Sequence, residues 1–354
     1  MMRIPINALP ILSLVLAGLA AQGAPGPATR PAPLPESATG PQSPSPQSST
    51  SQSSTSQSST SQSSTSQCGG VVAIGGGKLS DAIYRRILDL TGSGDPNILI
   101  LPLATAEPDV AGPRTEQRFR ENGAQRVDWK TFRRADANET KLLDAIAGAH
   151  VVFFPGGDQK RILEALRGTD AAKAIRDVLS RGGVIGGTSA GCEVLGDLSL
   201  TGPARTDLAV LGSTEVEPGL AFVPGVVFDQ HFLRRSRFLR LLSATLDAPK
   251  KVGIGVDEST AVVLPHGTRT IEVLGERQVT IFRLGDDTRA QSGARGDLAR
   301  TSNLRLHLLA AGDRYDLDRD LVTFSKNPSP APQLSDPSTD DADPRSPVDP
   351  KKNR

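Results

Sequence analysis

The chain has 354 residues, and its 40 basic and 39 acidic side chains leave a net charge of +1. This balance gives no reason to expect nucleic acid or an anionic membrane as a partner. Two cysteines, Cys68 and Cys192, are too few for a disulfide framework, and with four histidines they show no spacing typical of a metal site. We expect Cys192 to be a small buried residue that pairs with Cys68 only if the protein is exported.

Residues 1–24 are typical of a secretory signal peptide. Arg3 supplies a positive start, an apolar stretch covers residues 9–21, and small residues follow. The apolar stretch is shorter than the roughly 20 residues that span a membrane, and it leads into proline-rich sequence. We therefore expect cleavage between Ala20 and Ala24 and a secreted protein, extracellular or periplasmic, with a retained signal anchor as the alternative.

Residues 25–67 consist almost entirely of Pro, Ser, Gln, Thr, Ala and Gly, and they include four tandem copies of Q-S-S-T-S. A polar repeat of five residues cannot bury a face, so we expect a disordered linker. Residues 326–354 combine prolines with charges and show no apolar periodicity, which predicts a disordered tail. Residues 68–325 remain as the folded part, a length that suits one α/β domain.

Apolar strands and helical patterns alternate along the first half of this folded part. Strands are expected at residues 69–77, 97–106, 126–132, 150–158 and 182–188, and helices at residues 79–90, 110–122, 138–149 and 159–180. Ser80 is a candidate cap for the first helix. The alternation predicts βαβ units and a mostly parallel, doubly wound sheet.

The pattern changes after residue 198. A strand at residues 226–229 precedes a helix, and residues 253–267 and 270–284 alternate in the manner of antiparallel strands joined by turns. We therefore expect a C-terminal antiparallel extension of the sheet. Three glycine-rich strand ends, at residues 75–77, 155–158 and 187–191, should gather at the carboxyl edge, where such sheets bind ligands. A phosphate-binding role for residues 75–77 is not favoured, because no P-loop Lys-Ser pair follows.

The pentapeptide G-T-S-A-G at residues 187–191 fits G-x-S-x-G after a strand and before the helical sequence E-V-L-G-D. This context predicts a nucleophile elbow that exposes the hydroxyl of Ser189. The amide of Ala190 would point to the position of an oxyanion, and Gly156 or Gly157 would supply a second donor. The alternative is a glycine-rich turn of the kind that any α/β protein contains.

A serine of ordinary pKa needs a base, which is usually histidine. His150 opens a buried strand, His266 lies in a turn, and His307 occupies an alternating strand position. His231 lies where a strand leads into a helix, which is where a parallel sheet presents functional groups. By elimination we expect His231 to be the base.

A carboxylate should orient the imidazole. Spacing does not choose among the acidic residues between the serine and the histidine, which are Glu193, Asp197, Asp207, Glu215, Glu217 and Asp229.

Four arginines follow the candidate base closely, at Arg234, Arg235, Arg237 and Arg240. Such a run is usually a solvated helix face. At the mouth of a site it favours a substrate with carboxylates, because arginine binds them through paired hydrogen bonds. Gln159 and Gln230 would add polar groups at the same edge.

Four blocks in order resemble the cyanophycinase family, peptidase S51, which is related to aspartyl dipeptidase: P-G-G-D-Q, G-G-T-S-A-G, P-G-V-V-F-D-Q-H-F-L-R-R-S-R-F-L-R-L and G-I-G-V-D-E-S-T-A. The resemblance covers residues 69–284. It implies a sheet like that of class I glutamine amidotransferases, or flavodoxin-like, and it suggests a homodimer. Members cut cyanophycin, a poly-aspartate with arginine on each β-carboxyl, into β-Asp-Arg dipeptides.

The resemblance implies roles for individual residues. Ser189 matches the nucleophile, His231 matches the base, and Asp207 falls where the family's acid is expected, with Glu258 as a fallback. The positions that match substrate binding are Gln159, Asp229, Gln230, Arg235, Arg237 and Arg240. The expected reaction passes through an acyl-enzyme and needs no metal or organic cofactor. The signal peptide implies digestion of cyanophycin, or of another aspartate-rich peptide, outside the cytoplasm.

Two other functions fit the same sequence. A secreted aspartyl dipeptidase would act on short acidic peptides, and only the shape of the pocket distinguishes it. A binding protein on an inactive hydrolase scaffold would be expected to lack Ser189 or His231, and both are present. An amidotransferase would need cysteine at the elbow.

Overall fold

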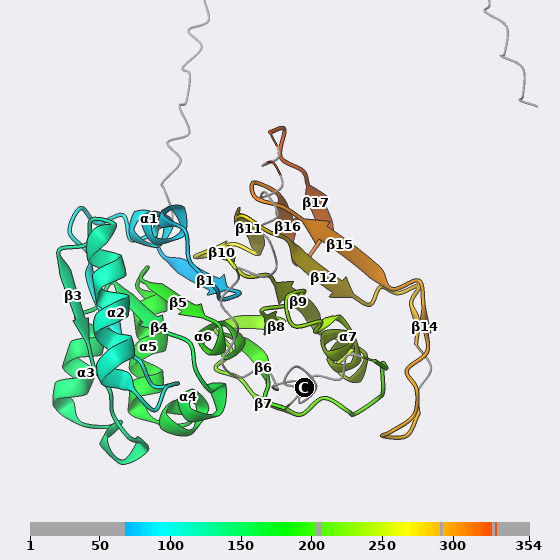
Figure 1. The fold of residues 1–354 in the computed structure, drawn as a ribbon, viewed down its shortest axis with the longest axis horizontal. Coiled ribbons are helices and arrows are strands. Elements are labelled where there is room, and N and C mark those ends of the chain that lie inside the picture. The colour runs from blue at the N-terminus through cyan, green and yellow to red at the C-terminus, as the bar shows by residue number, and fades with distance from the viewer. Residues whose placement is uncertain (1–67, 203–206, 291–292, 328–329, 331–354) are drawn as a thin grey trace, which may run out of the picture. The chain divides into compact units, whose positions relative to one another are not determined.

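The computed structural model describes residues 68–202, 207–290, 293–327 and 330. The predicted signal peptide, the linker and most of the predicted tail lie outside the described residues and stay predictions. Within the described ranges, no helix combines the length and the apolar character that crossing a membrane requires. The strands of these ranges form sheets of nine, six and two strands (Figure 1).

The parallel half of the nine-stranded sheet comes from the first half of the folded chain. Its strands, in chain order, are β1 (Gly70–Ile74), β2 (Asn97–Ile100), β3 (Arg126–Trp129), β4 (Val151–Phe154) and β5 (Val184–Thr188). In space they follow the order β1-β5-β4-β2-β3, and each neighbouring pair is parallel. Every strand is at or near a predicted position.

Helices cover both faces of this parallel sheet. They are α1 (Asp81–Leu90), α2 (Pro108–Glu121), α3 (Thr140–Ala147), α4 (Gln159–Leu166) and α5 (Asp170–Ser180), with a short 3₁₀ turn at Arg134–Asp136. Val72 of β1 packs in a cluster with Ile83 of α1, whereas Val71 packs in another with Ile146 of α3. Alternate side chains of a strand point to opposite faces, so the sheet is doubly wound and the α/β fold class is confirmed.

Antiparallel strands extend the same sheet beyond β1. They are β10 (Thr260–Pro265), β11 (Thr270–Gly275), β16 (Arg314–Asp316) and β17 (Leu321–Thr323), in the order β17-β16-β11-β10-β1. The expected C-terminal antiparallel extension is therefore present.

A second sheet was not expected from the sequence. It runs β15 (Arg305–Leu309), β12 (Val279–Arg283), β9 (Val252–Val256), β8 (Val223–Gln230), β6 (Gly196–Leu200) and β7 (Val216–Pro218), and β6, β8 and β9 are parallel. Helix α7 (Phe238–Asp247) packs on it through Leu241, which contacts the cluster of Val227 and Phe282. The two-stranded sheet pairs β13 (Arg289–Ala290) with β14 (Thr301–Ser302). Residues 253–267, expected in one antiparallel extension, are divided between the two larger sheets.

Two predicted helices differ in extent. The pattern at residues 159–180 is two helices, because the chain turns at Gly168, which has a φ of +73°. The helix after Ser189 is only α6 (Ala190–Glu193), since the chain enters β6 at Gly196. Ser80 lies at the start of α1 without a capping side-chain hydrogen bond.

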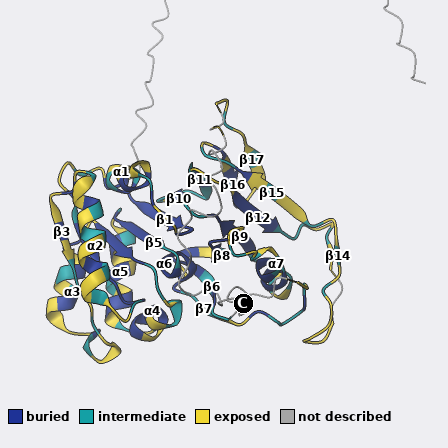
Figure 2. Ribbon diagram, in the orientation of Figure 1, coloured by how far each residue is buried: buried dark blue, intermediate teal, exposed yellow. Residues whose placement is uncertain are grey.

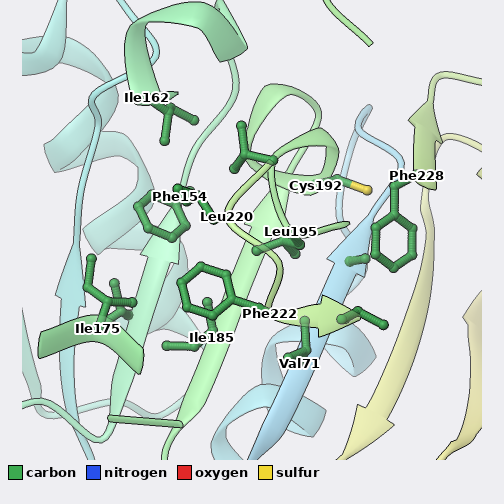
Figure 3. Packing of buried hydrophobic residues seen from close by; sticks show 14 of the residues in the cluster. Val71, Phe154, Ile162, Ile175, Ile185, Cys192, Leu195, Leu220, Phe222 and Phe228 are labelled. Atoms are coloured by element: carbon green, nitrogen blue, oxygen red, sulfur yellow. The ribbon is translucent and has the colours of Figure 1, made fainter. Parts of the chain in front are cut away.

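The core lies between the sheets and their helices. Most residues of the central strands are buried, whereas the outer faces of α2 and α3 are exposed (Figure 2). Figure 3 shows side chains of α4, α5 and the parallel strands meeting in one of these clusters, with Cys192 among them. Cys192 has no exposed surface, as expected for a small buried residue.

Gly191 tests how tightly the turn after β5 is packed. A Cβ at this position would lie 2.1 Å from the carbonyl oxygen of Phe154, which is too close for any side chain. We expect Gly191→Ala to lower the free energy of unfolding by about 1–3 kcal/mol, as overpacking does. Urea denaturation measures it, with Gly94→Ala as the control because nothing lies within 4 Å of that Cβ position. Equal midpoints for the two variants would contradict the packing described here.

Candidate active site

Ser189 lies at the sharp turn between β5 and α6. Its backbone has φ 53° and ψ −116°, a conformation that L-residues rarely adopt. The turn requires its flanking glycines, since a Cβ on Gly187 would lie 2.3 Å from the carbonyl oxygen of Gly191. Ser189 is only partly buried. The structure thus has the geometry predicted for a nucleophile elbow.

His231 reaches the hydroxyl from the second sheet. It follows the end of β8, and its Nε2 lies 3.0 Å from the Oγ of Ser189. The imidazole lies over Gly76, where a Cβ would come within 2.4 Å of the His231 Cε1. A side chain at position 76 would therefore displace the ring.

Glu258 contacts the other side of the imidazole. Its Oε1 lies 2.5 Å from the Nδ1 of His231. This hydrogen bond holds the pKa of the Glu258 carboxyl below its ordinary value, although partial burial opposes the effect. An ionised Glu258 fixes the Nδ1–H tautomer, which leaves Nε2 free to accept the proton of Ser189.

The prediction that Asp207 orients the histidine is wrong, and the fallback Glu258 has that place. The Nδ1 of His231 can make one hydrogen bond in the plane of the ring, and its partner is Glu258. After α6 the chain leaves the site along β6, and Asp207 lies in the connection between β6 and β7. The turn between β9 and β10 instead returns the chain to β1 and brings Glu258 to the imidazole.

Three consecutive carbonyl groups at the end of β1 hold all three segments. The carbonyl of Ile74 accepts the N–H of Ser189 at 3.0 Å, and the carbonyl of Gly75 accepts the N–H of His231 at 2.7 Å. The carbonyl of Gly76 accepts the N–H of Ser259, next to Glu258, at 2.8 Å.

Sequence reasoning missed this role of residues 75–77. Besides Gly76 under the histidine, a Cβ on Gly75 would lie 2.1 Å from the carbonyl oxygen of Asp257, and one on Gly77 would lie 2.9 Å from the Cβ of Glu258. Three glycines at a strand end indicate that other groups pack closely against the backbone there. The glycines do not indicate which residues those groups belong to.

Two of the predicted oxyanion donors, Ala190 and Gly156, lie next to Ser189. Ala190 is the first residue of α6, directly after Ser189. The loop after β4 comes close, because a Cβ on Gly156 would lie 3.2 Å from the Cβ of Ser189. The next residue, Gly157, has a φ of +147° and packs against the backbone of Ala104. The structure therefore places Ala190 and Gly156 beside Ser189, and Gly157 follows in the same loop.

Three of the predicted substrate-binding residues, Asp229, Gln230 and Arg240, are buried, and two of these pair with each other. Asp229 has no exposed surface and Arg240 has 2%. Arg240 donates from Nε and Nη2 to the carboxylate of Asp229, at 2.9 and 2.5 Å. We predicted that both residues contact substrate, and this is corrected. Beneath the site, Asp229 and Arg240 hydrogen-bond to each other instead.

Of the other predicted residues, Gln230 contacts the hydroxyl, and the rest contact neighbouring groups. The Oε1 of Gln230 is 3.3 Å from the Oγ of Ser189, and Gln159 donates to the carbonyl of Leu200 at 2.6 Å. Arg237 donates to the carbonyl of Gln230 at 2.7 Å, and the backbone N–H of Arg235 donates to the carbonyl of His231 at 2.9 Å.

The remaining histidines lie elsewhere. The Nδ1 of His150 accepts the N–H of Asn97 at 3.0 Å, and the Nε2 of His307 lies 3.1 Å from Asp320. The backbone N–H of His266 donates to the carbonyl of Gly69. Across the described ranges, no cluster of His, Cys, Asp and Glu has the arrangement of a metal site.

The correction from Asp207 to Glu258 is directly testable. A fluorophosphonate probe labels a serine that a histidine activates, without any need for a peptide substrate. We expect Glu258→Gln to slow labelling of Ser189 by about 1,000-fold, because the amide no longer holds the required tautomer. Asp207→Asn should label at the wild-type rate. Slow labelling of Asp207→Asn with normal labelling of Glu258→Gln would reverse the assignment.

Comparisons with known proteins show the family of the chain. The model of peptidase family S51 matches residues 71–271. A cyanophycinase from Geminocystis herdmanii is 34% identical over 253 residues, which are 70% of this chain and 93% of that protein. A cyanophycinase from Thermosynechococcus vestitus is 34% identical over 257 residues, 70% of this chain and 79% of that protein.

A solved structure supports the fold. The crystal structure of a peptidase from an acI-B1 Actinobacterium aligns with a TM-score of 0.54 and 21% identity, covering 71% of this chain and 97% of that one. At this identity the likeness bears on the fold alone. The family match covers more than half of the chain and includes Ser189, His231 and Glu258. The chain therefore belongs to peptidase family S51 and is a serine-type peptidase.

Proposed function

We propose that the protein is a secreted exopeptidase that hydrolyses cyanophycin to β-Asp-Arg dipeptides through a Ser189–His231–Glu258 triad. The observation that carries the catalytic part is the alignment of the triad, with 3.0 Å between the Ser189 Oγ and the His231 Nε2 and 2.5 Å between the His231 Nδ1 and Glu258. The substrate is inferred from the relatives, which are named cyanophycinases and match along most of their own length.

The reaction begins when His231 takes the proton of Ser189 and the Oγ attacks the α-peptide carbonyl between two aspartates. The negative oxygen that forms accepts hydrogen bonds from the amide of Ala190 and an amide of Gly156 or Gly157. His231 then protonates the leaving amine, and the carbon–nitrogen bond breaks. Water, deprotonated by the same histidine, hydrolyses the acyl-enzyme and releases the dipeptide.

Glu258 stabilises the imidazolium in both steps. Its lowered pKa keeps it ionised while His231 gains and loses a proton. Recognition of the aspartyl carboxylates falls to the basic segment after His231. Arg235 lies four residues after His231 in the sequence. The Arg237 side chain is 12% exposed. A guanidinium at this position suits a carboxylate near the scissile bond.

Hydrolysis of insoluble cyanophycin by the full chain tests the substrate, with products identified by mass. We expect β-Asp-Arg dipeptides from the wild type and none from Ser189→Ala, because the acyl-enzyme requires the hydroxyl. Release from Ser189→Ala would remove the proposed nucleophile. Cleavage of short aspartyl peptides without any attack on cyanophycin would make the protein an aspartyl dipeptidase. Retention of cyanophycin without cleavage would identify a binding protein.

Secretion is proposed from residues 1–24 alone. When the full chain is produced in a bacterial host, we expect the exported protein to begin between residues 21 and 25, because the small residues at this point suit signal peptidase. Sequencing of its N-terminus is the measurement, and an intact N-terminus in the membrane fraction would favour a retained anchor. The homodimer suggested by the resemblance stays a prediction, which the mass of the protein in solution tests.

A further inference from the structure

We propose that Glu193 is a positioning residue for the nucleophile, and that it acts by fixing helix α6 to the strand end that carries His231. The proposal rests on the serine-peptidase function above, and it gives a role to a residue that the sequence offered only as one of several acids. Glu193 has no exposed surface, so its carboxyl is part of the interior beneath the site.

Helix α6 and Ser189 are one rigid unit. The carbonyl of Ser189 accepts the N–H of Cys192 at 2.9 Å and the N–H of Glu193 at 3.2 Å. The helix is packed closely, since Gly191 allows no Cβ beside Phe154. A movement of Glu193 is therefore transmitted to the backbone of the nucleophile.

Arg240 joins this unit to the strand that carries the base. Its Nη2 donates to the Oε1 of Glu193 at 3.1 Å, while its Nε and Nη2 donate to both carboxylate oxygens of Asp229. Asp229 lies on β8, two residues before His231. A single buried guanidinium on α7 thus connects α6 with β8, in addition to the hydrogen bonds that hold Ser189 and His231 to the end of β1.

Arg237 holds the same strand end from a second side. Its Nη1 lies 3.3 Å from the Oδ1 of Asp229 and 2.7 Å from the carbonyl oxygen of Gln230. The side chain of Gln230 in turn contacts the Oγ of Ser189. The cluster of Glu193, Asp229, Arg237 and Arg240 therefore lies directly behind the catalytic hydrogen bond.

Burial raises the pKa of Glu193 to about 7, with a contribution from Asp229, while Arg240 and Arg237 oppose the shift. The other ionisable group beside it is the Cys192 thiol, whose pKa burial raises, so it stays uncharged. The second carboxyl oxygen of Glu193, Oε2, has no hydrogen-bond partner within the described ranges.

We expect the contact with Arg240 to persist when Glu193 carries a proton. A neutral carbonyl oxygen still accepts the guanidinium N–H. Length, and not charge, is then the property that the position requires. Glutamine should replace Glu193, whereas aspartate keeps the charge but is one methylene too short to reach Arg240.

The test compares rates of fluorophosphonate labelling in wild type, Glu193→Gln, Glu193→Asp and Val178→Ala. In this reaction the Ser189 Oγ bonds to phosphorus, fluoride leaves, and His231 takes the proton. Val178 is fully buried on α5 away from the triad, so Val178→Ala controls for a loss of stability without a change at the site. Rates are divided by the folded fraction, which circular dichroism gives.

We expect Glu193→Asp to label about 10-fold more slowly than wild type and Glu193→Gln to stay within about threefold, because displaced catalytic groups lose rate steeply. On substrate, Glu193→Asp should lower kcat with KM unchanged. Wild-type labelling by Glu193→Asp, or equally slow labelling by Glu193→Gln, would overturn the proposal.

The same experiment separates this inference from the proposed substrate. If the wild type labels with the expected order of variants but does not cleave cyanophycin, the substrate is wrong and the positioning role stands. If the wild type does not label at all, Ser189 is not an activated nucleophile and both proposals fail.

Discussion

Three backbone carbonyls at the carboxyl end of β1 determine where the catalytic groups lie. Successive carbonyls of Ile74, Gly75 and Gly76 accept N–H groups from the serine turn, from His231 and from the residue after Glu258. These acceptors are consecutive along the chain, at the last residue of β1 and the two residues after it, so the three segments are held side by side. Rigid placement of this kind is what acyl transfer needs, because the reacting groups must meet within a few tenths of an ångström.

The arrangement has a conformational cost. Ser189, His231 and Ser259 all have positive φ values, between 47° and 55°, and each such residue costs about 1–3 kcal/mol. The buried core supplies the stabilisation: β1 lies inside the first sheet, and the second sheet meets its end through the hydrogen bond from His231 to Gly75. The second sheet positions the histidine. It carries β8, and β8 delivers His231 to a serine that belongs to the first sheet.

Much of this was predictable from local pattern. Strand–helix alternation gave the doubly wound sheet, and G-x-S-x-G between a strand and a helix gave the elbow at Ser189. The choice of His231 followed from its position at a strand end.

The predictions that were wrong depend on packing between residues far apart in the sequence. Asp207 is close to Ser189 in sequence, but the acid that contacts the histidine follows α7 and β9. Local periodicity does not indicate that the chain comes back to the site after β9. The arginines after His231 looked solvent-facing or substrate-facing, yet Arg240 is buried by its pairing with Asp229 and Glu193, a partnership that involves three separate elements.

The most direct measurement is the proton NMR resonance of the His231 Nδ1–H in nitrogen-15-labelled protein. We predict a far-downfield, slowly exchanging proton in wild type that shifts strongly upfield or disappears in Glu258→Gln and is unchanged in Asp207→Asn. An unchanged resonance in Glu258→Gln would contradict it, because the imidazole would then be oriented by another group and the end of β1 would not assemble the triad described here.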